Sequence, residues 1–284
     1  MELGKSEIAM LSRFFRDENK LLLSSQGKLK QWLEQHFDLY HNGKGFVFTE
    51  QSKTRFRQEV ELLYPRMNIR QGLPSQQNRL EVVEYVNNDK LADIKPNDQY
   101  VLVTSQSAIN VFAREVVLAP TVSLRLPLDA IDIANLKSVI IVENLDVFDV
   151  WHQVKLEAKY QHSLVVYRGN DKSLAKGVKT LVNQLVQGTE VLLFPDLDPK
   201  GLEMAYTTQG VTGLLAPSLD DIQTKLSVYS QGSLFLRQLD SVTFLQKQQP
   251  QGWHDVQQLI LNQHLAIMQQ AVVLLGLRLR SFVR

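Results

Sequence analysis

Three acidic residues follow two short apolar stretches in the second half of the chain. The stretch SVIIVE (138–143) ends at Glu143, and EVLLFPD (190–196) ends at Asp196, with Asp198 two residues later. If both stretches are parallel strands of one sheet, their carboxyl ends meet at one edge, where ligands of such sheets collect. Like charges gathered there require a cation between them, and carboxylate oxygens suit Mg²⁺ or Mn²⁺. We therefore expect Glu143, Asp196 and Asp198 to bind a divalent metal and to be catalytic, since such an ion can polarise a phosphodiester and activate a water.

A structural role for the same acids stays open at this point. Asp198 precedes Pro199, and Asp is a favoured helix N-cap, while Pro is favoured in the first helical turn. Glu143 and Asn144 could begin the following helix in the same way. The occurrence of both motifs at strand ends, 53 residues apart, favours the metal site.

Basic residues near the same edge are candidate contacts to a phosphate backbone. Arg168 ends the stretch SLVVYRG (163–169), and Lys200 is close to the acidic pair. Three further lysines follow at the spacing of one helix face, at Lys172, Lys176 and Lys179. The alternative for these lysines is the polar face of an amphipathic helix.

The elements that would hold these residues alternate regularly from residue 137 onward. Strands are expected at 138–143, 163–169, 190–196 and 211–217, with helical patterns at 145–160, 171–188 and 199–208. This alternation predicts an α/β fold with a parallel sheet covered by helices on both faces. Earlier strands are expected at 100–105 and 121–126, a short helix at 108–114, and one long helix at 253–275.

The first 80 residues show a different pattern. Helical periodicity at 8–15, 29–36 and 51–64 surrounds a Gly-tipped hairpin that joins 39–40 to 46–48. This pattern is typical of a winged-helix DNA-binding domain over residues 1–80, joined by a linker at 66–80 to a second domain over 81–284. Residues 1–80 hold 13 Lys and Arg against 9 Asp and Glu, and the candidate DNA contacts are Lys44, Lys53, Arg55 and Arg57. A small helical cap without a role in DNA binding is the alternative.

These motifs resemble a known family. The segments VIIVEN, LVVYRG and LLFPDLDPKGLEMA are similar to those of a Toprim domain, the fold shared by topoisomerases, primases and some nucleases, over about residues 137–218. The Asp-x-Asp-Pro-x-Gly set and Gly169 are similar to the Toprim domain of topoisomerase VI, in its DNA-cleaving A chain. The pair Glu143-Asn144 with Phe148 is more similar to the JetD and MksG nucleases of the SMC-like Wadjet and MksBEFG plasmid-defence complexes.

The resemblance implies a Mg²⁺-dependent, or Mn²⁺-dependent, endonuclease that hydrolyses double-stranded DNA. It implies action within an SMC-like ATPase complex with a kleisin and associated subunits, and it leaves a homodimer open. Topoisomerase VI relatives carry a catalytic Tyr in an Arg-Glu-x-Tyr-Tyr type context, which neither Tyr40 nor Tyr64 shares. Three alternatives therefore remain: a non-catalytic protein for DNA binding or assembly, a strand-cleaving protein of the topoisomerase VI type, and a haloacid-dehalogenase-like phosphatase.

Composition narrows the class of protein. The length of 284 residues predicts about two domains, and a net charge of +1 excludes a global basic field. The absence of Cys excludes disulfides, thiolate zinc sites and cysteine nucleophiles. The longest apolar stretches are far shorter than the roughly 20 residues of a membrane span, and the N-terminus lacks a signal-peptide pattern. We expect a cytoplasmic, nucleoid-associated protein with no membrane contact.

Overall fold

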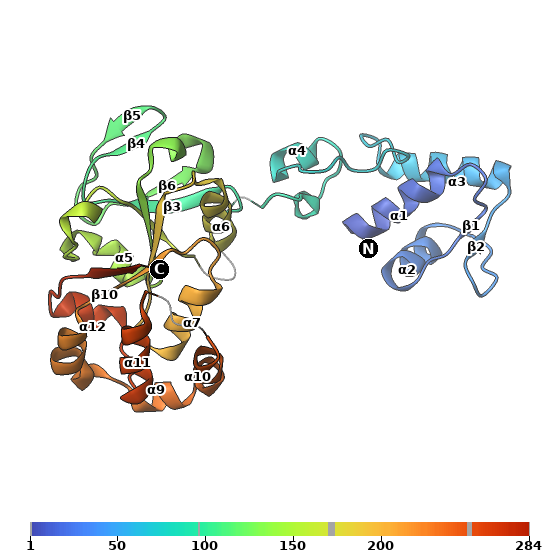
Figure 1. Cartoon of the computed structure of the whole chain (residues 1–284). Coiled ribbons are helices and arrows are strands. Elements are labelled where there is room, and N and C mark those ends of the chain that lie inside the picture. The colour runs from blue at the N-terminus through green and yellow to red at the C-terminus, as the bar shows by residue number, and fades with distance from the viewer. Residues whose placement is uncertain (1, 96, 170–173, 249–251, 284) are drawn as a thin grey trace. The chain divides into compact units, whose positions relative to one another are not determined.

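The computed structural model describes residues 2–95, 97–169, 174–248 and 252–283. The chain divides into two compact units, Met1–Pro96 and Asn97–Arg284 (Figure 1). The boundary lies 16 residues beyond the one expected after residue 80, because Val82, Val86 and Leu91 are buried in the core of the first unit. The linker expected at 66–80 is wrong for a similar reason, since its residues include Met67 and Ile69 of that core.

The N-terminal unit combines short helices with a two-stranded sheet. Its elements are α1 (Lys5–Arg16), β1 (Leu22–Leu23), α2 (Gly27–His36), β2 (Phe46–Val47), α3 (Glu50–Leu63), α4 (Arg79–Val83) and the 3-10 helix Asp89–Leu91. The three predicted helices are thus confirmed. Aromatic rings join them, with centroids 5.1 Å apart for Phe14 and Phe48 and 5.2 Å apart for Phe15 and Phe56.

The Gly-tipped turn is present, although its sheet differs from the expected hairpin. His41 bridges Phe46, and the amide of Val47 donates to the carbonyl of Tyr40. The main partner of β2 is β1, which precedes α2 in the chain, with Leu22 opposite Val47. A strand of two residues is too short for a periodic signal, so β1 was not predicted.

A seven-stranded sheet forms the centre of the C-terminal unit. Its strands are β3 (Tyr100–Thr104), β6 (Leu124–Pro127), β7 (Ser138–Val142), β8 (Leu164–Tyr167), β9 (Glu190–Phe194), β10 (Gly213–Ala216) and β11 (Arg280–Val283). They lie in the order β11-β10-β9-β7-β8-β3-β6. The four central strands β10, β9, β7 and β8 are parallel to one another, whereas β3, β6 and β11 each pair antiparallel to their neighbours. The expected α/β class with a largely parallel sheet is therefore confirmed.

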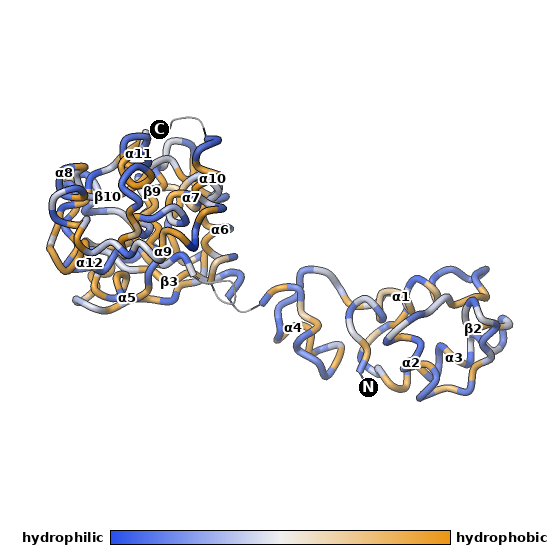
Figure 2. Tube along the Cα trace, turned by 90° about the horizontal axis from the view of Figure 1, so that it is seen from below, coloured by the Kyte–Doolittle hydropathy of each residue, from blue (hydrophilic) through white to orange (hydrophobic). Residues whose placement is uncertain are grey.

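Helices flank this sheet. They are α5 (Leu145–Asp149), α6 (Ala175–Gln184), α7 (Pro199–Thr207), α8 (Leu219–Asp221), α9 (Gly232–Leu236), α10 (Leu239–Gln246), α11 (His254–Asn262) and α12 (Gln269–Leu274). Short 3-10 segments lie at Leu128–Ala130, Ile133–Asn135, Trp151–Gln153, Ala158–Tyr160 and Ser227–Tyr229, and a π-helical segment at Ile222–Leu226. Figure 1 shows α9 to α12 gathered at one end of the unit, and the tube of Figure 2 shows β9 among hydrophobic segments. The apolar sheet is thereby covered, which stabilises the unit.

Three expectations for this unit are wrong in detail. Residues 108–114 form the hairpin of β4 (Ile109–Val111) and β5 (Arg114–Val116), not a helix. The long helix expected at 253–275 ends at Asn262 and resumes at Gln269, because Ile267 pairs with Leu197 through two backbone hydrogen bonds of 2.8 and 3.1 Å. The pattern at 145–160 yields only the short α5 and two 3-10 segments.

A membrane-crossing helix would have to be both long and strongly apolar, and no helix among the described residues meets both conditions.

Candidate functional site

Glu143 and Asp196 lie side by side at the carboxyl ends of two neighbouring strands. Glu143 follows β7 and Asp196 follows β9, and these strands pair in parallel register with Val142 opposite Phe194. The amide of Asp196 donates to Oε2 of Glu143 at 3.1 Å. From β7 the chain continues to β8 on one side, and from β9 it continues to β10 on the other. The two carboxylates therefore sit at a topological switch point, where α/β sheets bind their ligands.

The electrostatics of this pair favour the neutral, protonated forms. Burial, together with the nearby charges of Glu143 and Asp198, raises the pKa of Asp196 to about 7, although a hydrogen bond from the Gln269 amide acts in the opposite direction. Burial also raises the pKa of Glu143, although the Asp196 amide and the charge of Arg168 act in the opposite direction. Raised carboxyl pKa values in a crowded acidic site are a mark of functional positions.

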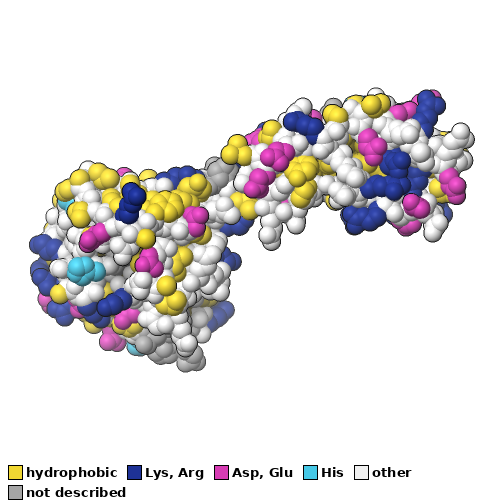
Figure 3. Space-filling view, turned by 90° about the horizontal axis from the view of Figure 1, so that it is seen from above, with side chains coloured by type: hydrophobic (Ala, Val, Ile, Leu, Met, Phe, Trp, Pro, Cys, Tyr) yellow, Lys and Arg dark blue, Asp and Glu magenta, His cyan; other side chains and the backbone are white. Residues whose placement is uncertain are grey.

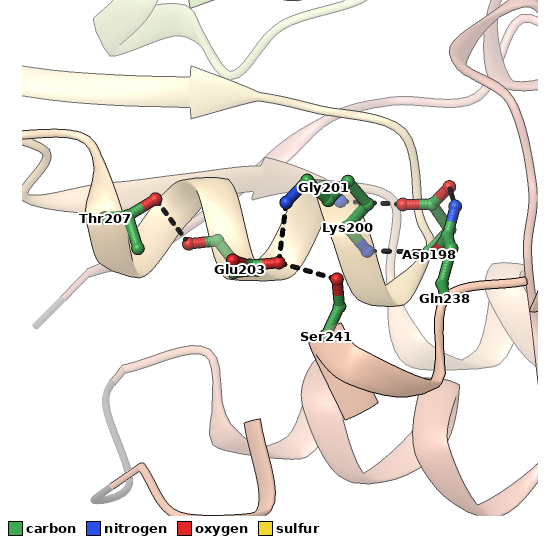
Figure 4. A network of polar contacts seen from close by, with 7 residues as sticks. All are labelled: Asp198, Lys200, Gly201, Glu203, Thr207, Gln238 and Ser241. Carbon is green, nitrogen blue, oxygen red and sulfur yellow. Dashed lines mark hydrogen bonds and ion pairs between the residues drawn. The ribbon is translucent and has the colours of Figure 1, made fainter. Parts of the chain in front are cut away.

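Asp198 lies near the other two acids but already has hydrogen-bond partners. It is 5% exposed and is the N-cap of α7, with Oδ1 accepting from the amide of Gly201 at 2.7 Å. Its Oδ2 accepts from Nε2 of Gln238 at 2.7 Å (Figure 4). The capping role that the sequence left open is thus present, and Asp198 is also near enough for its charge to raise the pKa values of both other acids.

The positions of Pro199 and Gly201 in the fold explain why these two residue types follow Asp198. Pro199 occupies the first turn of α7, where its missing N–H costs no hydrogen bond. A Cβ on Gly201 would lie 2.1 Å from the carbonyl oxygen of Asp196. A glycine is therefore needed for α7 to approach the Asp196 turn this closely.

Gln269 organises the site from a distant part of the chain, and no sequence pattern pointed to it. This first residue of α12 is 0% exposed. Its backbone amide donates to Oδ1 of Asp196 at 2.8 Å, and its side-chain Nε2 donates to the carbonyl of Phe194 at 2.7 Å. Its Oε1 accepts from the amide of Asn144 at 3.4 Å. One glutamine thus links the ends of β7 and β9 to the carboxylate of Asp196.

The pair Glu143 and Asp196 fits a divalent cation better than the full triad does. Among the described residues, Oε1 of Glu143 and Oδ2 of Asp196 accept no hydrogen bond, so each keeps an oxygen for a ligand. Mg²⁺ is commonly held by one or two carboxylates together with waters and substrate phosphates. Within the described part of the chain, no group of three or more His, Asp or Glu residues is arranged to hold a metal, and Asp198 is already bound by Gly201 and Gln238.

Among the described basic candidates of this unit, Arg168 is the one that lies beside the acids with an unpaired donor. It is close enough for its charge to lower the pKa of Glu143, and its buried Nε has no hydrogen-bond partner among those residues. Lys176 pairs with Asp98 at 2.6 Å, and Lys200 pairs with Glu203 at 2.9 Å (Figure 4). Lys179 is exposed. Lys172 lies outside the described residues.

The basic candidates of the N-terminal unit differ in their environments. Lys53 is 7% exposed, and its Nζ donates to the carbonyls of Asp17 and Lys20 at 2.5 and 2.9 Å. It is therefore a structural residue, and its prediction as a DNA contact is wrong. Arg55 is exposed and pairs with Glu59 at 3.0 Å, Arg57 is partly buried, 3.8 Å from Glu61, and Lys44 is exposed on the turn.

Gln238 provides a first test of this local network. We expect Gln238→Ala to lower the free energy of unfolding by about 1 to 2 kcal/mol, because a buried carboxylate loses a charge-assisted hydrogen bond. The amide of Lys200 also loses its acceptor, Oε1 of Gln238 at 3.0 Å. Urea denaturation measures the change, and Gln231→Ala, on an exposed side chain of the same region, is the control. Equal midpoints for both variants would contradict this role.

Comparison with known proteins places the chain in a family. A family model described as a domain of unknown function, DUF7281, matches residues 98–281, which include β7, β9 and Gln269. No curated protein sequence gives a significant match. Because the match covers well over half of the chain, the protein belongs to the DUF7281 family.

Proposed function

We propose that the protein is a divalent-metal-dependent DNA endonuclease whose reaction centre is the edge formed by Glu143 and Asp196. The observation that carries this proposal is the pairing of two carboxylates at a topological switch point, each with an unoccupied oxygen among the described residues. The raised pKa of Asp196 supports it, because two buried acids so close together lack a compensating charge. A divalent cation would supply that compensating charge.

Two features support a Toprim-like assignment of the C-terminal unit. The parallel strands run in the order β10-β9-β7-β8, so the first and third strands of the βα series are neighbours. Their ends bear Glu143 and the Asp-x-Asp pair, as the sequence resemblance implies. For the N-terminal unit, three helices with a small sheet and a Gly-tipped turn support a winged-helix-like module.

Each residue of the site has a separate task in this proposal. Glu143 and Asp196 would hold Mg²⁺ or Mn²⁺, which supplies polarisation of the phosphodiester and activation of a water. Arg168, with its buried Nε unpaired within the described residues, would bind a phosphate oxygen. Asp198 keeps the start of α7 against the Asp196 turn, and Gln269 fixes the orientation of the Asp196 carboxylate.

The partners in this proposal follow from the resemblance. They are double-stranded DNA and an SMC-like ATPase complex with a kleisin and associated subunits, at the nucleoid, with a homodimer left open. A tyrosine nucleophile of the topoisomerase VI type is not part of the proposal. Burial raises the pKa of Tyr64, which disfavours the phenolate that would attack a phosphate.

A non-catalytic role in DNA binding or assembly is the second candidate. It is favoured by the state of Asp198, whose two oxygens are both hydrogen-bonded, and by the lack of a three-residue metal group within the described ranges. This candidate predicts that the protein retains DNA without cutting it.

The decisive experiment uses supercoiled plasmid and the purified full chain. We expect nicking with Mg²⁺ or Mn²⁺, none with EDTA, and a loss of at least about a hundredfold in Glu143→Gln, because several kcal/mol of charge stabilisation disappear. Asp146→Asn is the matched control, since Asp146 is exposed on the neighbouring α5. DNA retention without nicking would establish the second candidate, and equal nicking by Glu143→Gln would exclude this site.

A further inference from the structure

The N-terminal unit contains a basic pocket at the start of α2, which we call the α2 pocket. Its volume is about 560 Å³, within the range of small-ligand sites. It is lined by Met10, Ser24, Ser25, Gln26, Gly27, Lys30, His41, Gly43 and Lys44. Two lysines and no acidic residue belong to this lining, all of it within the described residues. The pocket therefore favours an anion.

The first turn of α2 borders this pocket through Gly27 and Lys30, and no side chain caps its amides. The helix has ten residues, its N-cap Gln26 makes no side-chain capping hydrogen bond, and its first turn contains no acidic residue. The amides at a helix start lack intrahelical partners, and the helix dipole places partial positive charge there. Such a helix start binds phosphate groups when neighbouring side chains are positively charged or donate hydrogen bonds.

Ser25 is the independent observation that points to a ligand. It lines the α2 pocket, it is 6% exposed, and its Oγ has no hydrogen-bond partner among the described residues. A buried hydroxyl without a partner costs stability. A phosphate oxygen in the pocket would accept this hydroxyl proton and remove that cost.

The turn at 41–45 holds Lys44 in a defined place at the rim. Oδ1 of Asn42 accepts from the amides of Lys44 and Gly45 at 3.0 and 3.1 Å, and Nδ1 of His41 accepts from the amide of Gly43 at 3.0 Å. A Cβ at Gly27 or at Gly43 would meet nothing within 4 Å. Open space thus borders the backbone on both sides of the pocket, so that a ligand can approach it closely.

We propose that the α2 pocket binds a phosphate group of a nucleic-acid backbone, through the α2 amides, the Ser25 hydroxyl and the ammonium groups of Lys30 and Lys44. Among the described residues, the one ion pair of Lys30 is a long one, 3.7 Å to Glu34. Figure 3 shows Lys and Arg side chains gathered on one face of the N-terminal unit. The identification of DNA as the source of the phosphate rests on the proposed function, whereas the anion site itself does not.

Binding of a labelled duplex to the full chain, in EDTA and over a series of salt concentrations, tests the proposal. We expect Lys44→Ala to reduce the slope of log affinity against log salt by about one, and Ser25→Ala to weaken binding about tenfold. The melting temperature of Ser25→Ala should be no lower than that of the wild type, because the lost hydroxyl had no partner. Lys225→Ala removes the same charge from an exposed, paired side chain of the C-terminal unit, and an unchanged salt slope is expected.

A second experiment distinguishes free phosphate from nucleic acid as the ligand. It also distinguishes a failure of this proposal from a failure of the proposed function. Inorganic phosphate should raise the melting temperature of the wild type more than chloride does, and should lose this effect in Ser25→Ala. Phosphate binding without duplex binding would overturn the nucleic-acid source. Unchanged duplex binding and salt slope in both Lys44→Ala and Ser25→Ala would overturn the α2 pocket as the site, even if metal-dependent nicking upholds the proposed function. A wild type that neither binds nor nicks DNA would instead refute the proposed function.

Discussion

Replacement of Asp196 by Asn is expected to abolish metal-dependent nicking while making the metal-free protein more stable at pH 8. Asn keeps the size of the side chain and an oxygen that can accept the 2.8 Å hydrogen bond from the Gln269 amide. It removes the negative charge that the cation needs, so that nicking should fall by roughly a thousandfold or more. It also removes a buried charge that lies close to Glu143 and Asp198.

The sign of the stability change follows from the shift of the pKa. Folding raises the pKa of Asp196 to about 7, above an unfolded value of about 3.9, so the folded state binds the proton more tightly. The wild type therefore loses stability as the pH rises from about 4 to about 7, and then remains level. We expect Asp196→Asn to gain about 2 to 4 kcal/mol at pH 8, and less at pH 5.

Thermal unfolding in EDTA at several pH values measures this gain, and plasmid nicking measures the loss. Asp146→Asn, on an exposed residue of α5, should change neither. Saturating Mg²⁺ should stabilise the wild type and leave Asp196→Asn unaffected. A ligand that binds only the folded state raises the free energy of unfolding. A variant that is less stable at pH 8, or that still responds to Mg²⁺, would contradict the assignment of Asp196 as a metal ligand.

Replacement of Gln269 by Ala should damage both the fold and the site. The buried carbonyl of Phe194 and the amide of Asn144 would each lose a partner, and a cavity would replace the side chain. We expect a loss of about 2 to 4 kcal/mol in the free energy of unfolding. The backbone amide that donates to Asp196 remains in this variant. The side chain, however, holds the ends of β7 and β9 that carry both acids, so Mn²⁺ affinity should fall by about tenfold.

The neighbouring residue offers a matched control for this change. Gln270 lies in the same helix, and its Oε1 is buried without a partner among the described residues, so Gln270→Ala should cost less stability. Mn²⁺ titration followed by electron paramagnetic resonance separates a positioning role from a structural one. If Gln269→Ala is destabilised but binds Mn²⁺ like the wild type, the side chain of Gln269 supports the sheet edge without positioning the metal ligands.

The acidic residues could be predicted from local patterns because strands and caps leave short-range signals. Apolar stretches that end at Glu143 and Asp196 mark buried strands, and the Pro after Asp198 marks a helix start. That both strand ends lie at one edge of the sheet also followed from the βα alternation, whereas the direct pairing of β7 with β9 did not. These inferences need only the residues within each segment and the rules for joining parallel strands.

The residues that complete the site depended on contacts between distant segments. Gln269 meets Asn144 across 125 residues and Phe194 across 75, and Gln238 meets Asp198 across 40. Lys53 looked like an exposed cation on a helix, whereas α3 directs it to the carbonyls at the end of α1. The direction of a polar side chain depends on what packs against its element, and periodicity within the element contains no information about that neighbour.

By itself the sequence determined the α/β class, the strands that carry Glu143 and Asp196, and the capping chemistry around Asp198, because backbone propensity and hydrophobic period act over a few residues. Only the tertiary structure decided that α12 begins at Gln269 and that Lys53 is buried. Those outcomes arise from hydrogen bonds of buried polar groups, which must be satisfied by whichever partner the folded chain brings near.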